Sequence, residues 1–195
     1  MTDTFTHKFG GWSKAPARRW KNPDGSGGGV VAVSATINPT ACIAPSAEVR
    51  PGARIGSGAS IGEGANIGYL ARIGEGASIG GGARIDDSAN IGDSASIGNR
   101  AVIGNRANIG EGASIGDNAR IGYLASIGKG ASIGGGANIG YHARIGSGAS
   151  VGGGARTGNH ANIGDRASIG EGASIGSGAE YSSGDWLFVL GPQGS

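Results

Sequence analysis

The sequence has very little cysteine, few aromatic residues and no long apolar run. Cys42 is the only cysteine, so the 195-residue chain can form no internal disulfide. No stretch reaches the roughly 18 consecutive apolar residues of a membrane helix, and the start, MTDTFTHKFGGWSK, lacks the apolar core of a signal peptide. The formal net charge of +2 predicts no general attraction to nucleic acid or anionic membranes. We therefore expect a soluble cytoplasmic protein with neither nucleic acid nor membrane as a partner.

Glycine is abundant instead, at 44 residues, and its spacing excludes the two classes usually rich in it. Collagen places glycine at every third residue, whereas the dominant period here is six. Disorder is excluded because an aliphatic residue returns at every sixth position from Ile37 to Ile175, with Thr157 as the exception. Alanine stands two residues before each aliphatic residue, and glycine usually follows it. This pattern predicts a strand of about three residues and a turn, repeated as a solenoid.

A second period of 18 residues sets how many hexads make one coil. Serine precedes the aliphatic residue in a column spaced by 18, at Ser60, Ser78, Ser96, Ser114, Ser132, Ser150 and Ser168. Three hexads per coil stack like on like, which predicts an all-β, three-sided parallel β-helix of about eight to nine coils over residues 31–180. The aliphatic side chains are expected to point inward, with alanine near each corner. The second turn residue is expected to have a left-handed backbone.

The hexads ASIGEG, ANIGDR and ARIGSG resemble the repeat of the bacterial transferase hexapeptide family, in which glycine, two variable residues and a small residue follow an aliphatic residue. This resemblance covers roughly residues 31–180 and implies a left-handed β-helix, usually trimeric. Many members are acyltransferases that use acetyl-CoA or acyl carrier protein, with a histidine as general base and an extruded loop. Residues 37–180 contain no such loop, and fold alone does not fix an activity.

Two histidines are the candidate catalytic residues. His142 and His160 occupy the same place in the hexad, 18 residues apart, and we expect them to stack on adjacent coils. Either would serve as general base in an acyltransferase. The resemblance also brings in the γ-class carbonic anhydrases, whose zinc sites take histidines from two subunits, but in sets of three. Because no third ligand is evident here, we favour a pair of solvated turn residues, with no metal and no cofactor.

One edge of the prism collects bulky turn residues. Those expected at a subunit interface are Tyr69, Leu70, Tyr123, Leu124, Tyr141, His142 and His160. The other two edges carry mostly Gly, Ser, Glu and Asp. Apolar side chains concentrated on one exposed edge indicate that it is buried against something. A homotrimer contact is the simpler interpretation, and a ligand cleft between subunits is the alternative.

Two residues, Asp86 and Thr157, depart from the repeat in ways that raise a chemical question. Asp86 and Asp87 form an acidic pair that would hold a cation or pair with Arg84, although a solvated surface is the favoured interpretation. Thr157 replaces an inward aliphatic residue, and we expect its hydroxyl to bond to nearby backbone.

The two ends of the chain fall outside the regular repeat. Residues 1–30 form an arm in which basic residues alternate with Phe9, Trp12 and Trp20. This composition also suits binding of single-stranded nucleic acid, but an open first coil needs cover, so we favour a cap. Residues 181–195 predict a C-terminal cap or the first strand of a further, truncated element.

These features favour a non-catalytic structural or interaction scaffold, built as a homotrimeric solenoid. The alternative is a hexapeptide-type acyltransferase that uses acetyl-CoA, with His142 or His160 as base and the tyrosine edge lining the donor site. The uninterrupted coils favour the scaffold, because nothing within the helix predicts a deep substrate pocket.

Overall fold

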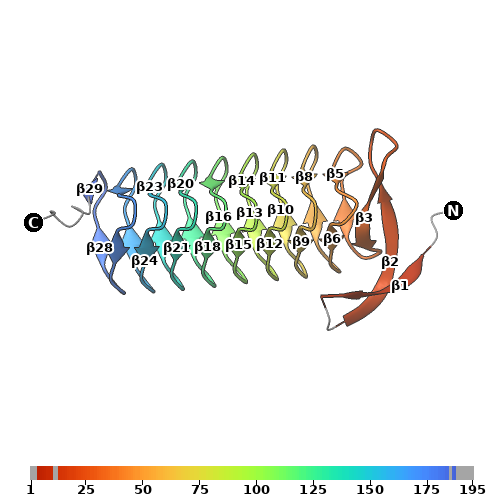
Figure 1. Ribbon diagram of the computed structural model, residues 1–195, viewed down its shortest axis with the longest axis horizontal. Coiled ribbons are helices and arrows are strands. Elements are labelled where there is room, and N and C mark those ends of the chain that lie inside the picture. Colours follow the sequence, from red (N-terminus) through yellow and green to blue (C-terminus); the bar gives the residue numbers. More distant parts are fainter. Residues whose placement is uncertain (1–3, 11–12, 185, 188–195) are drawn as a thin grey trace, which may run out of the picture.

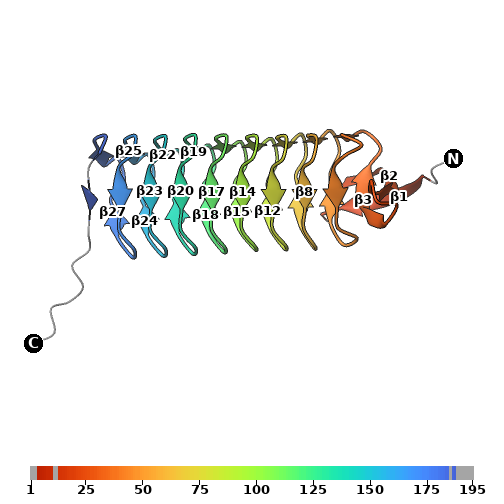
Figure 2. The same ribbon diagram turned by 90° about the horizontal axis from the view of Figure 1, so that it is seen from above.

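The computed structural model describes residues 4–10, 13–184 and 186–187, and forms a rod of stacked coils with an antiparallel element at one end (Figure 1). Each coil contributes one short strand to each of three parallel sheets, which form the faces of the rod (Figure 2). The predicted fold class, an all-β, three-sided, left-handed parallel β-helix of about eight coils, is confirmed. No helix in the described part of the chain is long and apolar enough to cross a membrane.

From β3 onward, the strands of each sheet follow one another 18 residues apart along the chain. Sheet A contains β1 (Phe5–Phe9), β2 (Ser13–Lys21), β3 (Gly27–Ala32), β6 (Glu48–Val49), β9 (Asn66–Ile67), β12 (Arg84–Ile85), β15 (Val102–Ile103), β18 (Arg120–Ile121), β21 (Asn138–Ile139), β24 (Arg156–Thr157) and β27 (Ser174–Ile175). Sheet B contains β4 (Thr36–Ile37), β7 (Arg54–Ile55), β10 (Arg72–Ile73), β13 (Asn90–Ile91), β16 (Asn108–Ile109), β19 (Ser126–Ile127), β22 (Arg144–Ile145), β25 (Asn162–Ile163) and β28 (Glu180–Tyr181). Sheet C contains β5 (Cys42–Ile43), β8 (Ser60–Ile61), β11 (Ser78–Ile79), β14 (Ser96–Ile97), β17 (Ser114–Ile115), β20 (Ser132–Ile133), β23 (Ser150–Val151), β26 (Ser168–Ile169) and β29 (Trp186–Leu187). We call the turns between these sheets the A/B, B/C and C/A corners.

The strand register confirms the 18-residue coil. Ser78 pairs in parallel with Ser60 on one side and with Ser96 on the other. The regular strands are two residues long rather than the expected three, because the glycine that follows each inward residue already begins the turn. This glycine still contributes to the ladder, since the amide of Gly62 donates to the carbonyl of Ile79 at 2.8 Å.

The core is a column of isoleucines bordered at the corners by alanines. Ile103 and Ala101 are fully buried, and the same holds with little variation along the whole helix. Burying one isoleucine side chain stabilises the fold by about 1.5–3 kcal/mol, so the repeated column is the main source of stability. Thr157 is the buried polar exception, and its Oγ1 accepts a hydrogen bond from the amide of Gly140 at 3.3 Å. The expected bond to nearby backbone is therefore present.

Each corner is a two-residue turn whose second residue has a left-handed backbone, as expected; Asn118, for example, has a φ of 59°. The first turn residue is often Asp or Asn, and its side chain ties two coils together. The amide of Gly81 donates to Asn99 Oδ1 at 2.8 Å, and the amide of Ser147 donates to Asp165 Oδ1 at 2.7 Å. These bonds give each coil an attachment to its neighbour beyond the strand ladder.

The N-terminal strands extend sheet A beyond the first coil. Strand β2 pairs antiparallel with both β1 and β3, and β3 pairs in parallel with β6. Trp20 is 8% exposed, and its Nε1 donates to the carbonyl of Ala41 at 3.2 Å. His7 Nε2 lies 3.0 Å from Glu48 Oε1. Strand β2 is thus fixed to the first coil through a buried indole, and β1 through a side-chain pair.

The regular register continues to the C-terminal end of the described residues, where β28 pairs with β25 and β29 pairs with β26. Trp12 and residues 188–195, which the sequence analysis assigned to the two terminal segments, lie outside the described residues.

Replacing Ile103 by Asp is expected to prevent folding, because it would place an unpaired charge in a narrow core to which each of the three sheets contributes one side chain per coil. Circular dichroism and the soluble fraction measure this. The control is Asn108→Asp, which introduces the same carboxylate at an exposed strand position and should fold normally. A folded, soluble Ile103→Asp variant would contradict the inward register.

Replacing Asn99 by Ala is expected to lower the free energy of unfolding by about 1 kcal/mol, because the amide of Gly81 loses its acceptor on the next coil. Denaturant unfolding measures the difference. Glu75→Ala is the matched control, since Glu75 is also a first turn residue but uses its backbone amide, not its side chain, to bond Asp93. Equal losses in the two variants would argue against the inter-coil role of the Asn side chain.

Candidate functional site

The A/B corner carries two parallel ladders of bulky side chains. Its first turn residues include Tyr69, Tyr123 and Tyr141, which we call the Tyr ladder. Its second turn residues include Leu70, Leu124, His142 and His160, which we call the Leu/His ladder. All the residues that the sequence analysis assigned to an interface or to catalysis therefore lie on this one edge.

The aromatic rings stack along the edge with the repeat of the coils. Tyr123 and Tyr141 have ring centroids 5.2 Å apart and an interplanar angle of 11°. His142 and His160 are also 5.2 Å apart, with an angle of 9°, which agrees with the stacking expected from their spacing. The two ladders meet edge to face, because the Tyr141 and His142 centroids are 4.1 Å apart at 63°. Four rings thus form one continuous cluster.

The A/B corner is largely open to solvent, although Tyr123, Leu124 and His142 are partly buried. Tyr69 is 50% exposed, Leu70 is 47% exposed and Tyr141 is 41% exposed. In the described residues the other large exposed apolar side chains are Phe5, in the N-terminal strands, and Val33, which lies in the turn between β3 and β4 at the A/B corner. The exposed apolar surface of the β-helix itself is therefore concentrated at one of its three corners.

The backbone at this corner is also strained. Leu70 and Leu124 both have φ of 56°, and His142 and His160 have φ of 55° and 59°. A non-glycine residue in the left-handed region costs roughly 1–2 kcal/mol. At the B/C corner glycine occupies most equivalent positions, whereas here bulky side chains replace it in successive coils. Such strain persists where the surrounding structure enforces it and often marks a functional surface.

A groove lies beside the Leu/His ladder, on the sheet B side of the corner. Its volume is about 560 Å³, and the residues that line it are Leu124, Ser126, His142, Arg144, His160, Ala161, Asn162 and Glu180. One wall is formed by the ladder and the floor by the outward side chains of β19, β22, β25 and β28. The two histidines therefore face a polar depression that also contains a guanidinium and a carboxylate.

The groove offers proton-transfer chemistry more readily than metal binding. A neutral imidazole at His142 or His160 has a ring nitrogen able to accept a proton from a bound hydroxyl or amine. Among the described residues no group of three or more His, Cys, Asp or Glu side chains is placed to hold a metal ion. The arrangement thus contains a possible base and a cation, Arg144, in one depression.

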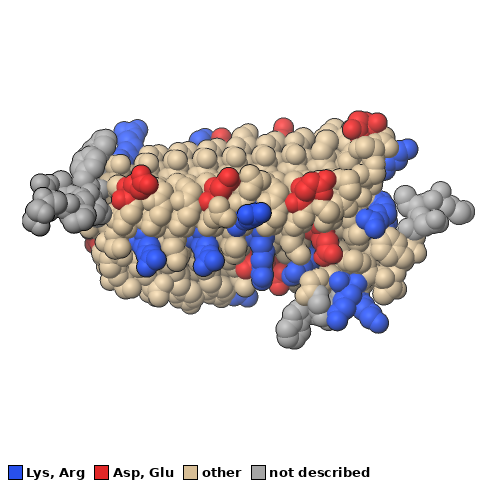
Figure 3. Space-filling model, viewed as in Figure 1, with Lys and Arg blue, Asp and Glu red and all other residues tan. Residues whose placement is uncertain are grey.

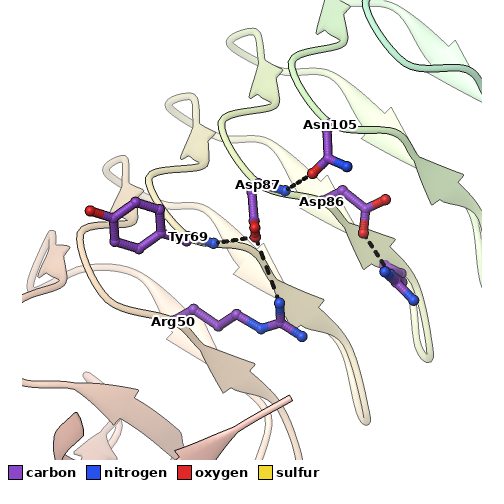
Figure 4. Close-up of polar contacts among 6 residues, drawn as sticks. Arg50, Tyr69, Asp86, Asp87 and Asn105 are labelled. Carbon is purple, nitrogen blue, oxygen red and sulfur yellow. Dashed lines mark hydrogen bonds and ion pairs between the residues drawn. The ribbon is translucent and has the colours of Figure 1, made fainter. Parts of the chain in front are cut away.

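A second polar cluster, at the start of the helix, involves a residue that the sequence analysis missed (Figure 4). Arg50 Nη1 lies 3.6 Å from Asp87 Oδ1, and the same carboxylate oxygen accepts a hydrogen bond from the amide of Tyr69 at 2.8 Å. The amide of Asp87 in turn donates to Asn105 Oδ1 at 2.9 Å. Gly10 packs so closely on the Arg50 guanidinium that a Cβ would overlap it. The cluster joins the N-terminal strands to the first coils.

Asp86 pairs with Arg84, one of the alternatives drawn from the sequence. Arg84 Nε lies 2.5 Å from Asp86 Oδ1. The two carboxylates are paired with different arginines, Asp86 with Arg84 and Asp87 with Arg50, so each already has a positively charged partner. The sequence signal was the loss of glycine at position 86, together with Arg50 at the equivalent position two coils earlier.

No protein-family model and no curated protein sequence matches the chain. Solved structures that match include a UDP-N-acetylglucosamine acyltransferase from Francisella novicida, at 26% identity and a TM-score of 0.44, over 71% of this chain and 62% of that one. A variant of perosamine N-acetyltransferase from Caulobacter crescentus, in complex with CoA and GDP-perosamine, matches at 15% identity and a TM-score of 0.45, over 78% and 51%. LpxA from Acinetobacter baumannii matches at 20% identity and a TM-score of 0.44, over 78% and 70%.

The chain spans less than two thirds of the length of the first two of these structures. All three are acyltransferases, the class to which the hexapeptide resemblance pointed. At these TM-scores the matches assign no activity to this chain, so its function is argued from its own surface.

Proposed function

We propose that the protein is a rigid, non-catalytic scaffold that associates as a homotrimer in the cytoplasm through the A/B corner. The observation that carries this proposal is the concentration of exposed Tyr69, Leu70 and Tyr141 at one corner of an otherwise polar rod. Aromatic side chains are enriched in the buried centres of protein interfaces, because they bring large apolar area with little loss of conformational freedom.

The geometry of the Tyr ladder favours a parallel neighbour. Tyr69, Tyr123 and Tyr141 are separated by whole coils, so a second rod lying parallel and in register would present a matching ring to each of them. A third copy closes the arrangement about a threefold axis, and closed cyclic symmetry leaves no unsatisfied copy of the stripe. Tyr141 is more exposed than Tyr123, so Tyr141 has more side-chain surface available for contact with a neighbouring rod.

The double variant Tyr123→Ser with Tyr141→Ser is expected to be monomeric while each rod stays folded, since neither side chain faces the core. Light scattering measures the mass, and circular dichroism measures the fold. The matched control is Glu75→Ser with Glu111→Ser, which changes two first turn residues at the B/C corner and should stay trimeric. A monomeric wild type, or a trimeric tyrosine variant, would overturn the proposal.

A second candidate function, a hexapeptide-type acyltransferase, is favoured by the two histidines in the groove. In this role one imidazole removes the proton of an acceptor hydroxyl or amine as the acceptor attacks the thioester carbonyl of acetyl-CoA. A new C–O or C–N bond forms, the C–S bond breaks, and CoA leaves as the thiol. Arg144 supplies a positive charge beside the histidines for a phosphate of the donor.

Isothermal titration with acetyl-CoA tests this second candidate. If the chain is an acyltransferase, acetyl-CoA binds the wild type, and His142→Asn with His160→Asn weakens binding or abolishes transfer to an amine acceptor. His7→Asn is the control, because His7 lies at the N-terminal strands beside Glu48. Absence of acetyl-CoA binding at millimolar concentration would remove the acyltransferase and leave the scaffold.

A further inference from the structure

The outward side chains of sheet B form a straight, mostly basic and amide column along the rod. In chain order they are Thr36, Arg54, Arg72, Asn90, Asn108, Ser126, Arg144, Asn162 and Glu180. Successive members are neighbours on adjacent strands, about 4.8 Å apart. From Arg54 to Asn162 every member can donate a hydrogen bond and none is acidic.

The arginines of this column are free to bind an anion. Arg54, Arg72 and Arg144 are exposed, and none takes part in the ion pairs found among the described residues. Sheet C differs completely, because most of its equivalent positions hold serine. The positive charge is therefore local to particular faces, although the formal net charge of the chain is only +2. Figure 3 shows a different face, along which sheet A strands such as β12, β18 and β24 are labelled in Figure 1, and there too Lys and Arg side chains follow one another along the axis beside Asp and Glu.

Two hollows lie along this column, both against the Leu/His ladder. The first, of about 310 Å³, is lined by Gly52, Arg54, Leu70, Arg72, Ser88 and Asn90. The second is the groove beside His142 and His160 described above. Each combines a strained leucine, at least one arginine and an asparagine. We call the column and its adjoining ladder the sheet B groove.

We propose that the sheet B groove binds a linear anionic polysaccharide, with about one sugar ring per coil. Arginine recognises carboxylate with charge-assisted, often bidentate hydrogen bonds, and the asparagine amides bond sugar hydroxyls. The leucine and imidazole side chains offer an apolar wall to the ring faces. A coil spacing close to the length of one linked sugar ring lets successive sugars meet successive rungs in the same way.

The arrangement of the rings favours a polysaccharide over single-stranded nucleic acid. Proteins bind unpaired bases by stacking them on free aromatic faces. Here Tyr123 stacks on Tyr141, and His142 stacks on His160, so one face of each of these four rings is already covered. A chain rich in hydroxyls and carboxylates needs no such faces.

Acidic residues at the B/C corner border the opposite side of sheet B. Glu75, Asp93, Glu111 and Asp165 are first turn residues there, and Glu111 is paired with Lys129. They repel a polyanion from that side, which keeps it against the A/B corner. The groove and the proposed trimer contact share Leu70 but otherwise use different side chains, since the groove uses the Leu/His ladder and sheet B and the trimer contact uses the Tyr ladder, so the two proposals are tested separately.

The probe is an oligomannuronate about seven sugars long, one for each rung from Arg54 to Asn162, titrated at low salt by calorimetry. We expect binding that weakens as salt rises, and no binding of a neutral cello-oligosaccharide of the same length. Arg72→Gln with Arg144→Gln should weaken binding about tenfold or more. The matched control is Arg120→Gln with Arg156→Gln, which removes the same charge from sheet A and should leave binding nearly unchanged.

Three results would overturn the inference. These are equal losses in the two arginine variants, tighter binding of oligothymidylate than of oligomannuronate, and absence of oligomannuronate binding to the wild type. The Tyr123→Ser, Tyr141→Ser variant separates the inference from the proposed trimer, because its mass reports the trimer and its oligomannuronate affinity reports the groove. If the variant is monomeric and keeps its affinity for oligomannuronate, the result supports the proposed sheet B groove. If the affinity is lost, the result contradicts the claim that the groove binds independently of the trimer.

Discussion

The stacking of each coil directly on the next, one strand spacing apart, is the constraint on which the rest of the structure depends. Backbone approaches so closely between coils that a Cβ on Gly110 would lie 2.6 Å from the amide nitrogen of Lys129. Glycine after the inward residue is therefore favoured by contact between coils rather than by a special φ, and Arg50 and Asp86 are exceptions near the start of the helix. The same contact places each isoleucine on its equivalent, so the core fills by repetition of one side chain.

This constraint confines variation to a few positions per hexad, and so decides where chemistry can sit. The inward residue, the alanine and the glycine are fixed by packing, which leaves two turn residues and one outward strand residue. Because equivalents stack, a substitution that recurs every 18 residues becomes a ladder rather than a scattered set. The tyrosines, the histidines and the sheet B arginines are three results of this rule. Any binding surface built from such positions therefore runs as a line of side chains along the axis of the rod.

Much of the fold followed from the sequence by arithmetic. The period of 18 fixed which residues stack, so the contact between His142 and His160 was predictable without any coordinates. The inter-coil role of Asn99 and its equivalents was not, because it depends on how the turn orients a side chain toward the preceding coil. The contact between Arg50 and Asp87 also escaped prediction, since it accompanies the packing of the non-repeat N-terminal strands. Contacts between equivalent residues of the repeat can be predicted from the sequence, whereas contacts that depart from the repeat are found only in the folded structure.

The strained residues of the A/B corner show how a rigid scaffold holds a binding surface ready. Leu124 and His142 keep a left-handed backbone because the ladder bonds of the coils above and below leave no alternative. In an isolated turn such residues would adopt another backbone conformation, and their side chains would no longer be aligned. Here the cost is offset by the isoleucine core, so the side chains stay aligned before any partner arrives. A partner that meets them loses little free energy to ordering the surface, and affinity then depends mainly on how well its own repeat matches the coils.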